Sequence, residues 1–495
     1  MDTNFEPIHI VWLKRDLRLY DHKPILEAIN SKKRVLLLYV FEDILFKDPH
    51  YSSRHFNFIK ESIRDINKQL KNYKTVVCLA NGDIIKILAS ISRKFKIKTI
   101  HAHQETGVMA TYKRDQQVVA WCQKNKIAFK EYLQQGVFRG IKNRNDWLKK
   151  WDQLMNQKIE KISFSVSNFI PLKTIESFEF YLGEDTLQTE SKGIHQIGGY
   201  QNAYRYLNSF FNYRYRNYQK HISKPDLSRR SCSRLSPYLA FGNISMRQLL
   251  QKTEYERTQG NKSYALRAFS SRLRWQSHFI QKFEMECSME FTSINKGYHQ
   301  LKKTINPSYI EAWEKGNTGF PLIDAAMRCL VETGYLNFRM RSLIVSFFTH
   351  HLWQPWQACA HFLARQFLDF EPGIHYPQLQ MQAGVTGINM LRIYNPVKNG
   401  KEHDPKGVFI KQWIPELSML PEAIVHTPWL MNSFETSIYG FKLGKDYPKP
   451  IIDLEKSRKN ATSTLWPISK SPAVRKEGKR ILAKHTLANR NSLMI

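Results

Sequence analysis

Cysteine is scarce in this sequence, which contains six cysteines among 495 residues. No two of them form a C-x-x-C pair, and their scattered spacing supports neither a zinc site nor a disulfide framework. Unpaired cysteines are typical of a reducing compartment, so the sequence predicts a cytoplasmic protein without a metal site. The six residues are Cys78, Cys122, Cys232, Cys287, Cys329 and Cys359.

Long hydrophobic runs and a signal-peptide pattern are also missing from the sequence. A membrane-spanning helix needs about 20 consecutive apolar residues. The longer apolar stretches, at residues 34–41 and 343–348, are short enough to be buried strands or helix faces. We therefore expect no membrane span.

Acidic residues are few relative to basic ones, with 43 Asp and Glu against 75 Lys and Arg. The formal charge of +32 and the pI of about 9.8 favour a polyanionic partner, because neutralised phosphates release condensed counterions. A membrane surface would also attract this charge, but without a membrane-targeting segment nucleic acid is the better candidate. Hydrophobic residues make up 42% of the chain, which is enough for more than one core.

A glycine-rich G-x-G-x-x-G turn is missing after the first predicted strand, which argues against an ordinary dinucleotide-binding unit. A charged loop, residues 14–18, follows that strand instead. The N-terminal part nevertheless alternates between β-rich and amphipathic segments, which predicts a doubly wound parallel α/β domain. The strands are expected at residues 9–13, 34–41, 75–80, 97–103 and 127–132, and the helices at 23–29, 54–70, 83–93 and 108–125.

The patterns divide the chain into four segments. Residues 1–135 are predicted to form the α/β domain, and the polar stretch 136–198 an interdomain linker. Helical periodicity dominates from residue 199 onward, so residues 199–440 are predicted to form an all-α domain. The segment 441–495 is basic, has several prolines and shows weak periodicity, so we expect a partly ordered or disordered tail.

Several motifs recur in the order and type of one known family. The N-terminal stretch VWLKRDLRLYD is suggestive, and the helical half adds longer matches. The motifs are VWLKRDLRLYD at 11–21, SRLSPYL at 233–239, GNTGFPLIDAAMR at 316–328, RIYNP at 392–396, HDP at 403–405 and WIPEL at 413–417. Over residues 8–420 the chain thereby resembles the photolyase/cryptochrome family, and it is most similar to a less familiar bacterial branch of it.

This resemblance implies a blue-light-driven flavoprotein. In the family, the helical domain holds FAD and the α/β domain can carry an antenna chromophore of the folate or deazaflavin type. A DNA photolyase passes an electron from reduced FAD to a cyclobutane pyrimidine dimer flipped out of DNA, whereas a cryptochrome signals without repair. The implied partner is UV-damaged DNA, single-stranded DNA included, and a monomer is expected. Both functions remain open, with repair as the first hypothesis and cryptochrome-type signalling as the second.

The turn at residues 233–239 resembles the family's phosphate-gripping turn. Small hydroxyl residues before a helix leave backbone N–H groups free for phosphate, although an ordinary N-cap followed by Pro237 would explain the same pattern. Tyr218 stands where the family places a tyrosine on these phosphates. A cysteine replaces the family's threonine at the first position of the turn, and its thiol is a weak donor. The residues implied for this turn are Cys232, Ser233, Arg234, Leu235 and Ser236.

A second group of residues matches the family's flavin-ring contacts. Arg341 and Asp369 correspond to an arginine and aspartate beside the isoalloxazine, where the guanidinium would stabilise an anionic reduced flavin. A structural salt bridge between two helices is the alternative interpretation. Glu371 stands where the family has a second acidic residue, and Phe370 stands where glycine is usual.

The substrate side departs from the usual repair pattern. Trp275 matches a tryptophan that stacks on the flipped dimer, although it could equally be a core residue of an amphipathic helix. Arg272 replaces a glutamate that hydrogen-bonds the dimer, and an arginine cannot accept a hydrogen bond. Gln276 replaces the arginine of the family's Trp-Arg pair. Phe338 stands near the position where enzymes that repair (6-4) photoproducts use a histidine, which disfavours that lesion.

The family's tryptophan relay for photoreduction of the flavin is incomplete here. Trp356 aligns with its middle member, whereas Lys303 replaces the surface member. The inner member falls in the stretch HYPQL at 375–379, where Tyr376 is a possible substitute carrier, as is Trp353 elsewhere.

Three further assignments stay open or are disfavoured. The residue that contacts flavin N5 is left unassigned among Gly373, Ile374 and His375. Glu105 resembles a folate-contacting glutamate of the family, but an isolated acidic residue at a strand end is more often a solvated surface group. The cysteines of the helical half lack the close pair of the iron–sulfur branch, so a cluster is not expected.

Overall fold

The computed structural model describes residues 5–189, 194–259 and 263–487, and it begins with a five-stranded parallel sheet. The strand order is β3-β2-β1-β4-β5, with every neighbouring pair parallel. The predicted parallel α/β domain is therefore confirmed. The strands are β1 (Pro7–Leu13), β2 (Arg34–Glu42), β3 (Cys78–Gly82), β4 (Lys96–His103) and β5 (Ala128–Tyr132).

Helices cover both faces of this sheet, which is why its central strands read as continuous apolar runs. In β2 every residue except Arg34 is buried. Alternate side chains enter two different cores: Leu37 and Tyr39 join one, and Leu36 and Leu38 join the other. The main helices of this domain are α1 (Lys23–Asn30), α3 (Ser53–Leu70), α4 (Ile84–Ser92) and α5 (Met109–Lys124).

The segment predicted as a linker contributes to the cores that it crosses. It contains α6 (Trp147–Met155) and α7 (Leu172–Glu176), and residues 190–193 lie outside the described part. Trp147 and Trp151 are buried in the same core as α3. Ile170 donates its backbone N–H to the carbonyl of Val35 at 3.1 Å, an ordinary length for such a bond.

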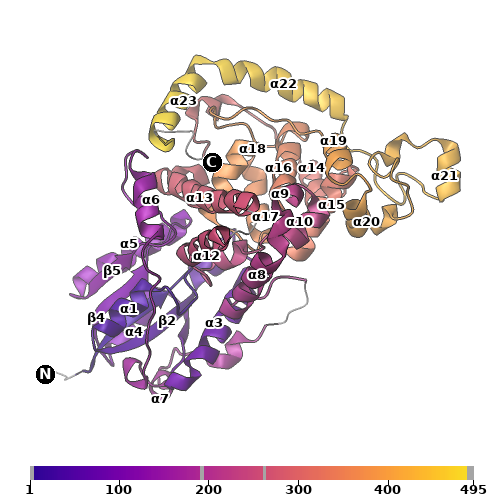
Figure 1. The fold of residues 1–495 in the computed structure, drawn as a ribbon. Coiled ribbons are helices and arrows are strands. Elements are labelled where there is room, and N and C mark those ends of the chain that lie inside the picture. The colour runs from indigo at the N-terminus through magenta and orange to yellow at the C-terminus, as the bar shows by residue number, and fades with distance from the viewer. Residues whose placement is uncertain (1–4, 190–193, 260–262, 488–495) are drawn as a thin grey trace.

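The second domain is all helical (Figure 1), as the sequence predicted; most of its apolar residues form a core of their own, whereas some from its first helices share a core with the sheet. The helix α18 packs so closely on α13 that a Cβ at Gly373 would lie only 2.7 Å from Ile280 Cα. The longer helices up to residue 413 are α8 (Tyr200–Asn212), α12 (Met246–Thr258), α13 (Ser263–Met285), α14 (Pro307–Glu314), α15 (Pro321–Thr333), α16 (Phe338–Ser346), α17 (Gln357–Gln366), α18 (Pro372–Gln382) and α19 (Pro396–His403).

The charged loop after β1 docks the sheet onto the helical domain. Leu17 donates its backbone N–H to Phe241 and accepts a hydrogen bond from the amide of Asn243, at 3.0 and 2.9 Å. Gly242 has φ +69°, and a Cβ there would lie 2.4 Å from the carbonyl oxygen of Arg15. Two charged side chains of the loop also cross this contact, since Arg15 donates to the carbonyl of Ala240 and Arg18 to that of Gly242.

The expectation of a partly ordered or disordered tail is wrong for residues 454–485. Two helices, α22 (Leu454–Lys470) and α23 (Pro472–His485), lie across the helical domain, in yellow at the top of Figure 1. Val474 and Ile481 are buried in the core of that domain. The residues on the buried face of α23 recur every three or four positions, which a charge-rich composition conceals in the sequence.

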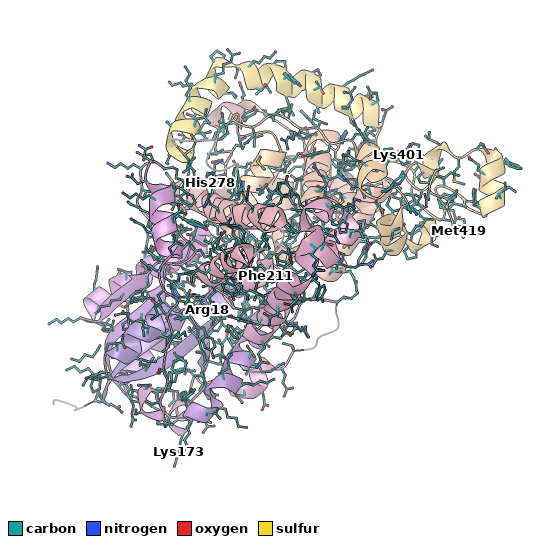
Figure 2. All side chains as sticks on the ribbon, in the orientation of Figure 1. Arg18, Lys173, Phe211, His278, Lys401 and Met419 are labelled. Carbon is teal, nitrogen blue, oxygen red and sulfur yellow. The ribbon has the colours of Figure 1, made fainter. Side chains whose placement is uncertain are left out.

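Basic side chains cover much of the outer surface. In Figure 2, Lys173 and Lys401 project from the periphery, whereas Phe211 lies in the interior. Among the helices of the described segments, none combines the length and the hydropathy that a bilayer crossing requires.

Candidate active site

A cavity of about 320 Å³ opens inside the helical domain, between α13, α16, α18 and the turn that precedes α11 (Ser236–Ala240). The structure brings all ten predicted cofactor residues to its wall. Of the predicted substrate and relay residues, Arg272 also lines the cavity, whereas Trp275 and Trp356 do not. The ten are Tyr218, Cys232, Ser233, Arg234, Leu235, Ser236, Arg341, Asp369, Phe370 and Glu371.

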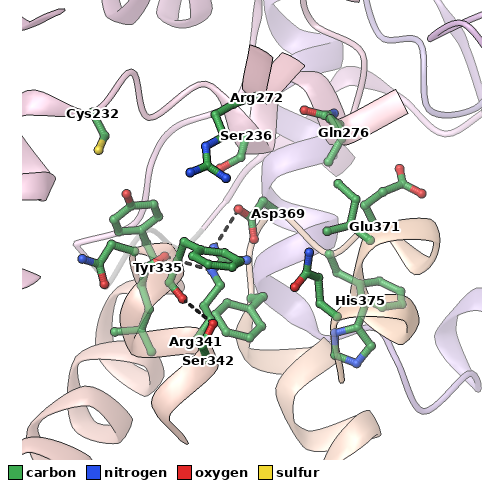
Figure 3. A pocket seen from close by; sticks show the side chains of 18 of the residues that line it. Cys232, Ser236, Arg272, Gln276, Tyr335, Arg341, Ser342, Asp369, Glu371 and His375 are labelled. Atoms are coloured by element: carbon green, nitrogen blue, oxygen red, sulfur yellow. Dashed lines mark hydrogen bonds and ion pairs between the residues drawn. The ribbon is translucent and has the colours of Figure 1, made fainter. Parts of the chain in front are cut away.

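Arg341 and Asp369 form an ion pair at the centre of this wall (Figure 3). Arg341 Nη2 donates to Asp369 Oδ2 at 2.8 Å, and its Nε donates to the carbonyl of Leu336 at 2.9 Å. The other carboxylate oxygen, Asp369 Oδ1, is buried and has no hydrogen-bond partner among the described residues. An unpaired buried acceptor costs about 1–3 kcal/mol, so this oxygen is available to a bound ligand or a water molecule.

Two more buried polar atoms at the cavity wall lack partners in the described part of the chain. One is the acceptor Gln378 Oε1 on α18, and the other is the donor Arg234 Nε in the turn. The Arg234 guanidinium lies 3.7 Å from the ring centre of Tyr335. The sequence did not single out Gln378, since no local pattern shows where a helix side chain points. The cavity thus offers unused donors and acceptors beside aromatic rings, as a polar, flat-ringed ligand requires.

The turn at residues 232–236 does not contain an ordinary N-cap. Leu235 occupies the N-cap position of α11, and no side chain caps that helix. Arg234 holds a positive φ of 60°, and the Arg214 guanidinium donates to the carbonyls of Cys232 and Ser233. Burial raises the pKa of Cys232 to about 12, so its thiol stays protonated. The Arg214 guanidinium thus holds the backbone of the turn in place, and both Ser233 and Ser236 line the cavity.

Tyr218 is 6% exposed and packs edge-on against Phe210 and Phe269, with ring centres 5.9 and 5.6 Å apart. Burial raises the pKa of its phenol, which is therefore a neutral hydrogen-bonding group. This packing holds the ring at the cavity wall and leaves the hydroxyl as its polar end.

Glu371 lines the cavity, but its charge is already paired. Arg15 from the loop after β1 places Nη2 3.0 Å from Glu371 Oε2 and also donates to the carbonyl of Phe370 at 2.8 Å. Burial raises the pKa of Glu371, and the charge of Arg15 opposes that rise. The sequence did not reveal this partner, because 356 positions along the chain separate the pair.

On the substrate side, α13 presents Arg272 and Gln276 to the cavity, whereas Trp275 faces away from it. Positions 272 and 276 are four residues apart and share one helix face. The Trp275 ring packs instead against His278 and Phe279, with centres 5.2 and 5.7 Å apart. Trp275 is half-buried and packs along its own helix, and its proposed stacking on a dimer stays a prediction.

The relay residues lie behind the cavity. Trp356 is buried and donates from Nε1 to Ser293 Oγ at 3.1 Å, and its ring centre is 6.1 Å from that of Tyr376. Lys303 places its ammonium group 4.3 Å from the ring centre of Trp353, and burial lowers the pKa of Lys303 to about 7. Tyr376, one of the two substitute carriers considered from the sequence, is thus the one whose ring contacts Trp356.

Of the three residues considered for the N5 contact, Ile374 and His375 line the cavity. His375 Nε2 lies 2.9 Å from the carbonyl of Ala360, and burial lowers the pKa of His375 to about 3. The imidazole is therefore neutral and donates away from the cavity.

Glu105 lies at the carboxyl end of β4, beside the loop after β1, where parallel sheets commonly bind ligands. Its carboxylate is not a solvated surface group: Arg114 Nη2 lies 2.6 Å away and Lys14 Nζ 3.8 Å. The adjacent cavity has a volume of only about 30 Å³. An antenna chromophore stays unassigned.

Asp16, His22 and His103 converge as a group with metal-ligand chemistry in the described residues. Asp16 Oδ2 lies 3.1 Å from His22 Nε2 and 2.7 Å from His103 Nδ1. Burial would raise the pKa of Asp16, but the two histidines hold it well below its usual range. The hydrogen bond of His103 and the ion pair of His22 both use Asp16 Oδ2, so the group connects the loop after β1 with β4 and the start of α1.

Comparison with known proteins points to one family. The family model "DNA photolyase" matches residues 9–142, and "FAD binding domain of DNA photolyase" matches residues 269–467. A deoxyribodipyrimidine photo-lyase of Alkalihalophilus pseudofirmus is 26% identical over 93% of this chain and 98% of its own. A cryptochrome DASH of Gloeobacter violaceus is 26% identical over 90% and 93%. The crystal structure of a Synechocystis cryptochrome superposes with a TM-score of 0.83 at 22% identity, covering 93% of this chain and 99% of that one.

Proposed function

The chain belongs to the photolyase/cryptochrome family, and within it we propose that the protein is a DNA photolyase. The proposed reaction is the splitting of cyclobutane pyrimidine dimers by an electron from reduced FAD under blue light. The relatives include both photo-lyases and cryptochromes, so the choice between repair and signalling rests on the site.

FAD is the cofactor of the helical domain, and the residues at the 320 Å³ cavity fit it. We propose that the turn at 232–236 and Tyr218 hold its phosphates, since they offer hydroxyls and backbone N–H groups. The unpaired Asp369 Oδ1 and Gln378 Oε1 would accept hydrogen bonds from its N–H groups. When bound, FAD supplies the light-driven electron, and the protein supplies position and charge.

Arg341 would stabilise negative charge on the reduced ring, and Asp369 would hold that guanidinium in place at 2.8 Å. Phe370 and Tyr335 would exclude water from the ring, which strengthens these interactions. The proposed flavin site rests above all on one observation: Arg341 pairs with Asp369, and the other Asp369 oxygen has no partner among the described residues.

On the DNA side, we propose that a flipped dimer contacts Arg272 and Gln276 at the cavity (Figure 3). Gln276 can donate hydrogen bonds to a pyrimidine edge and accept them from it. Its amide oxygen could thereby replace the acceptor that the absent glutamate would supply. The charge of +32 supports binding to the phosphate backbone. We further propose that the protein acts in the cytoplasm and as a monomer.

A repair assay tests this proposal. Chemically reduced protein would be mixed with UV-irradiated thymine oligonucleotides, single- and double-stranded, and kept in blue light or in the dark. We expect dimers to disappear only in the light. Bound FAD without dimer loss on either substrate would overturn the repair assignment.

Cryptochrome-type signalling is the second candidate, and one observation favours it: Arg272, which cannot accept a hydrogen bond, stands at the position of the dimer-binding glutamate. Binding measurements separate the two functions. A photolyase prefers UV-damaged over undamaged oligonucleotides, whereas equal binding of both would favour the photoreceptor.

A further inference from the structure

Three side chains, Asp48, His50 and Tyr376, form a hydrogen-bonded row directly behind the cavity. His50 Nε2 contacts the Tyr376 hydroxyl, and His50 Nδ1 lies 2.6 Å from Asp48 Oδ1. His50 and Tyr376 are 2% and 0% exposed. The row joins the two domains, since His50 precedes α3 and Tyr376 belongs to α18.

The hydrogen bonds of this row define where its protons are. The Asp48 carboxylate only accepts, and it also takes the backbone N–H of His50 at 2.9 Å. His50 therefore carries its proton on Nδ1, which leaves the lone pair of Nε2 for the hydroxyl of Tyr376. Burial raises the pKa of Tyr376, so the phenol keeps its proton at rest. Tyr376 donates and His50 accepts.

Aromatic contacts place Tyr376 between the cavity and Trp356. Two cavity-lining rings touch the row: Phe370 stacks on His50 with centres 5.3 Å apart, and His375 meets Tyr376 edge-on at 5.3 Å. On its far side Tyr376 lies 6.1 Å from Trp356, which borders a separate cavity. Other titratable groups also face the row: the His361 ring is 4.7 Å from that of His50, and Glu290 and Tyr51 interact electrostatically with Tyr376.

We propose that Tyr376 is the electron donor that photoreduces the flavin of this protein, with His50 as its proton acceptor; this rests on the proposed flavin photochemistry. Tyr376 loses one electron to the light-excited oxidised flavin. Its O–H bond breaks at the same time, and the proton moves to His50 Nε2. The products on the protein are a neutral tyrosyl radical and an imidazolium ion that donates to Asp48.

A base is needed at this position because an oxidised phenol that keeps its proton would be a buried, unpaired cation. The Asp48 carboxylate balances the charge that His50 gains, at 2.6 Å. A thiolate in solution then supplies one electron through Trp356, and His50 returns the proton to Tyr376. The row thus replaces the tryptophan that the relay lacks at its inner position.

The experiment uses the purified, FAD-loaded protein and follows radicals by electron paramagnetic resonance under blue light. Wild-type protein should give a tyrosyl signal that narrows when ring-deuterated tyrosine is incorporated, and Tyr376→Phe should abolish it. His50→Gln, which can accept a hydrogen bond but not a proton, should slow flavin photoreduction about 100-fold. Tyr298→Phe is the matched control, since Tyr298 is a buried tyrosine at the neighbouring cavity, and it should change neither readout.

The outcomes separate this proposal from the proposed function. Chemically reduced Tyr376→Phe should repair dimers at the wild-type rate, because only the reduction step needs the tyrosine. A tyrosyl signal and a photoreduction rate unchanged by Tyr376→Phe would overturn the proposal and leave the row as a structural tie between the domains. A wild-type protein that forms the Tyr376 radical but repairs no dimers would instead count against repair alone.

Discussion

Arg15 Nη2 lies 3.0 Å from Glu371 Oε2, so a guanidinium from the α/β domain neutralises a carboxylate at the cavity wall of the helical domain. Both side chains are largely buried, at 12% and 5% exposure. The same Arg15 donates to the carbonyls of Ala240 and Phe370, at 3.0 and 2.8 Å. Domain contact and cofactor site are thus coupled through one side chain.

We expect Arg15→Met to lower the free energy of unfolding by about 3–5 kcal/mol, because it leaves Glu371 as an unpaired buried charge. The urea midpoint, followed by circular dichroism, measures this loss. The control is Arg230→Ala, which breaks an exposed pair with Asp226 and should cost less than about 1 kcal/mol. Equal effects of both variants would show that the Arg15 pair is no stronger than a surface pair.

Arg341→Ala should weaken FAD binding about 10- to 100-fold, since a charge-assisted hydrogen bond contributes about 1.5–3 kcal/mol. The bound fraction is read from the flavin absorbance of the purified protein and from titration of the apoprotein. Arg328→Ala is the matched control, because Arg328 pairs with Glu416 at 2.6 Å away from the cavity. Normal FAD content in Arg341→Ala would place the flavin elsewhere.

The five strands follow from local apolar patterns, whereas the residues of the cavity were implied by the resemblance to the family. Parallel strands covered on both faces are continuous apolar runs, as in β2, and the cofactor motifs are contiguous stretches such as residues 233–239. Side-chain direction is not local. Trp275 turns toward His278 rather than the cavity, and Gln378 turns into it, and neither follows from spacing alone.

The tail shows why composition misleads. Basic residues outnumber acidic ones in residues 441–495, yet Val474, Gly478, Ile481 and His485 form a buried face of α23 at intervals of three or four. The helix is stable because that face packs on the helical domain, which no sequence window can show.

Arg272→Ala should lower the affinity for UV-damaged oligonucleotides about tenfold, the equivalent of ~1.4 kcal/mol, and reduce the preference over undamaged ones. The reason is that Arg272 lines the cavity proposed to receive the flipped dimer. Filter binding at several salt concentrations measures both effects. The control is Arg267→Ala, because Arg267 is an exposed arginine on the same helix. This variant should lower the affinity for damaged and undamaged oligonucleotides equally. Loss of affinity for both substrates in Arg272→Ala would make this side chain a phosphate contact only.

Glu286 anchors α23 through Arg480, Lys484 and His485, and its contribution to stability should depend on pH. Burial alone would raise the pKa of Glu286, but the hydrogen bond with His485 and the charges of Lys484 and Arg480 lower it to about 2. The folded pKa lies below the unfolded one, so the stabilisation is complete above about pH 4.5 and is lost as the pH falls toward 2. Glu286→Gln should therefore lower the melting temperature at pH 7, and the gap to wild type should narrow below pH 4.5. The control is Glu455→Gln, which removes an exposed charge from α22 and should keep the same melting-temperature difference from wild type at every pH. A melting-temperature difference for Glu286→Gln that stays constant from pH 7 to pH 3 would refute the pH dependence.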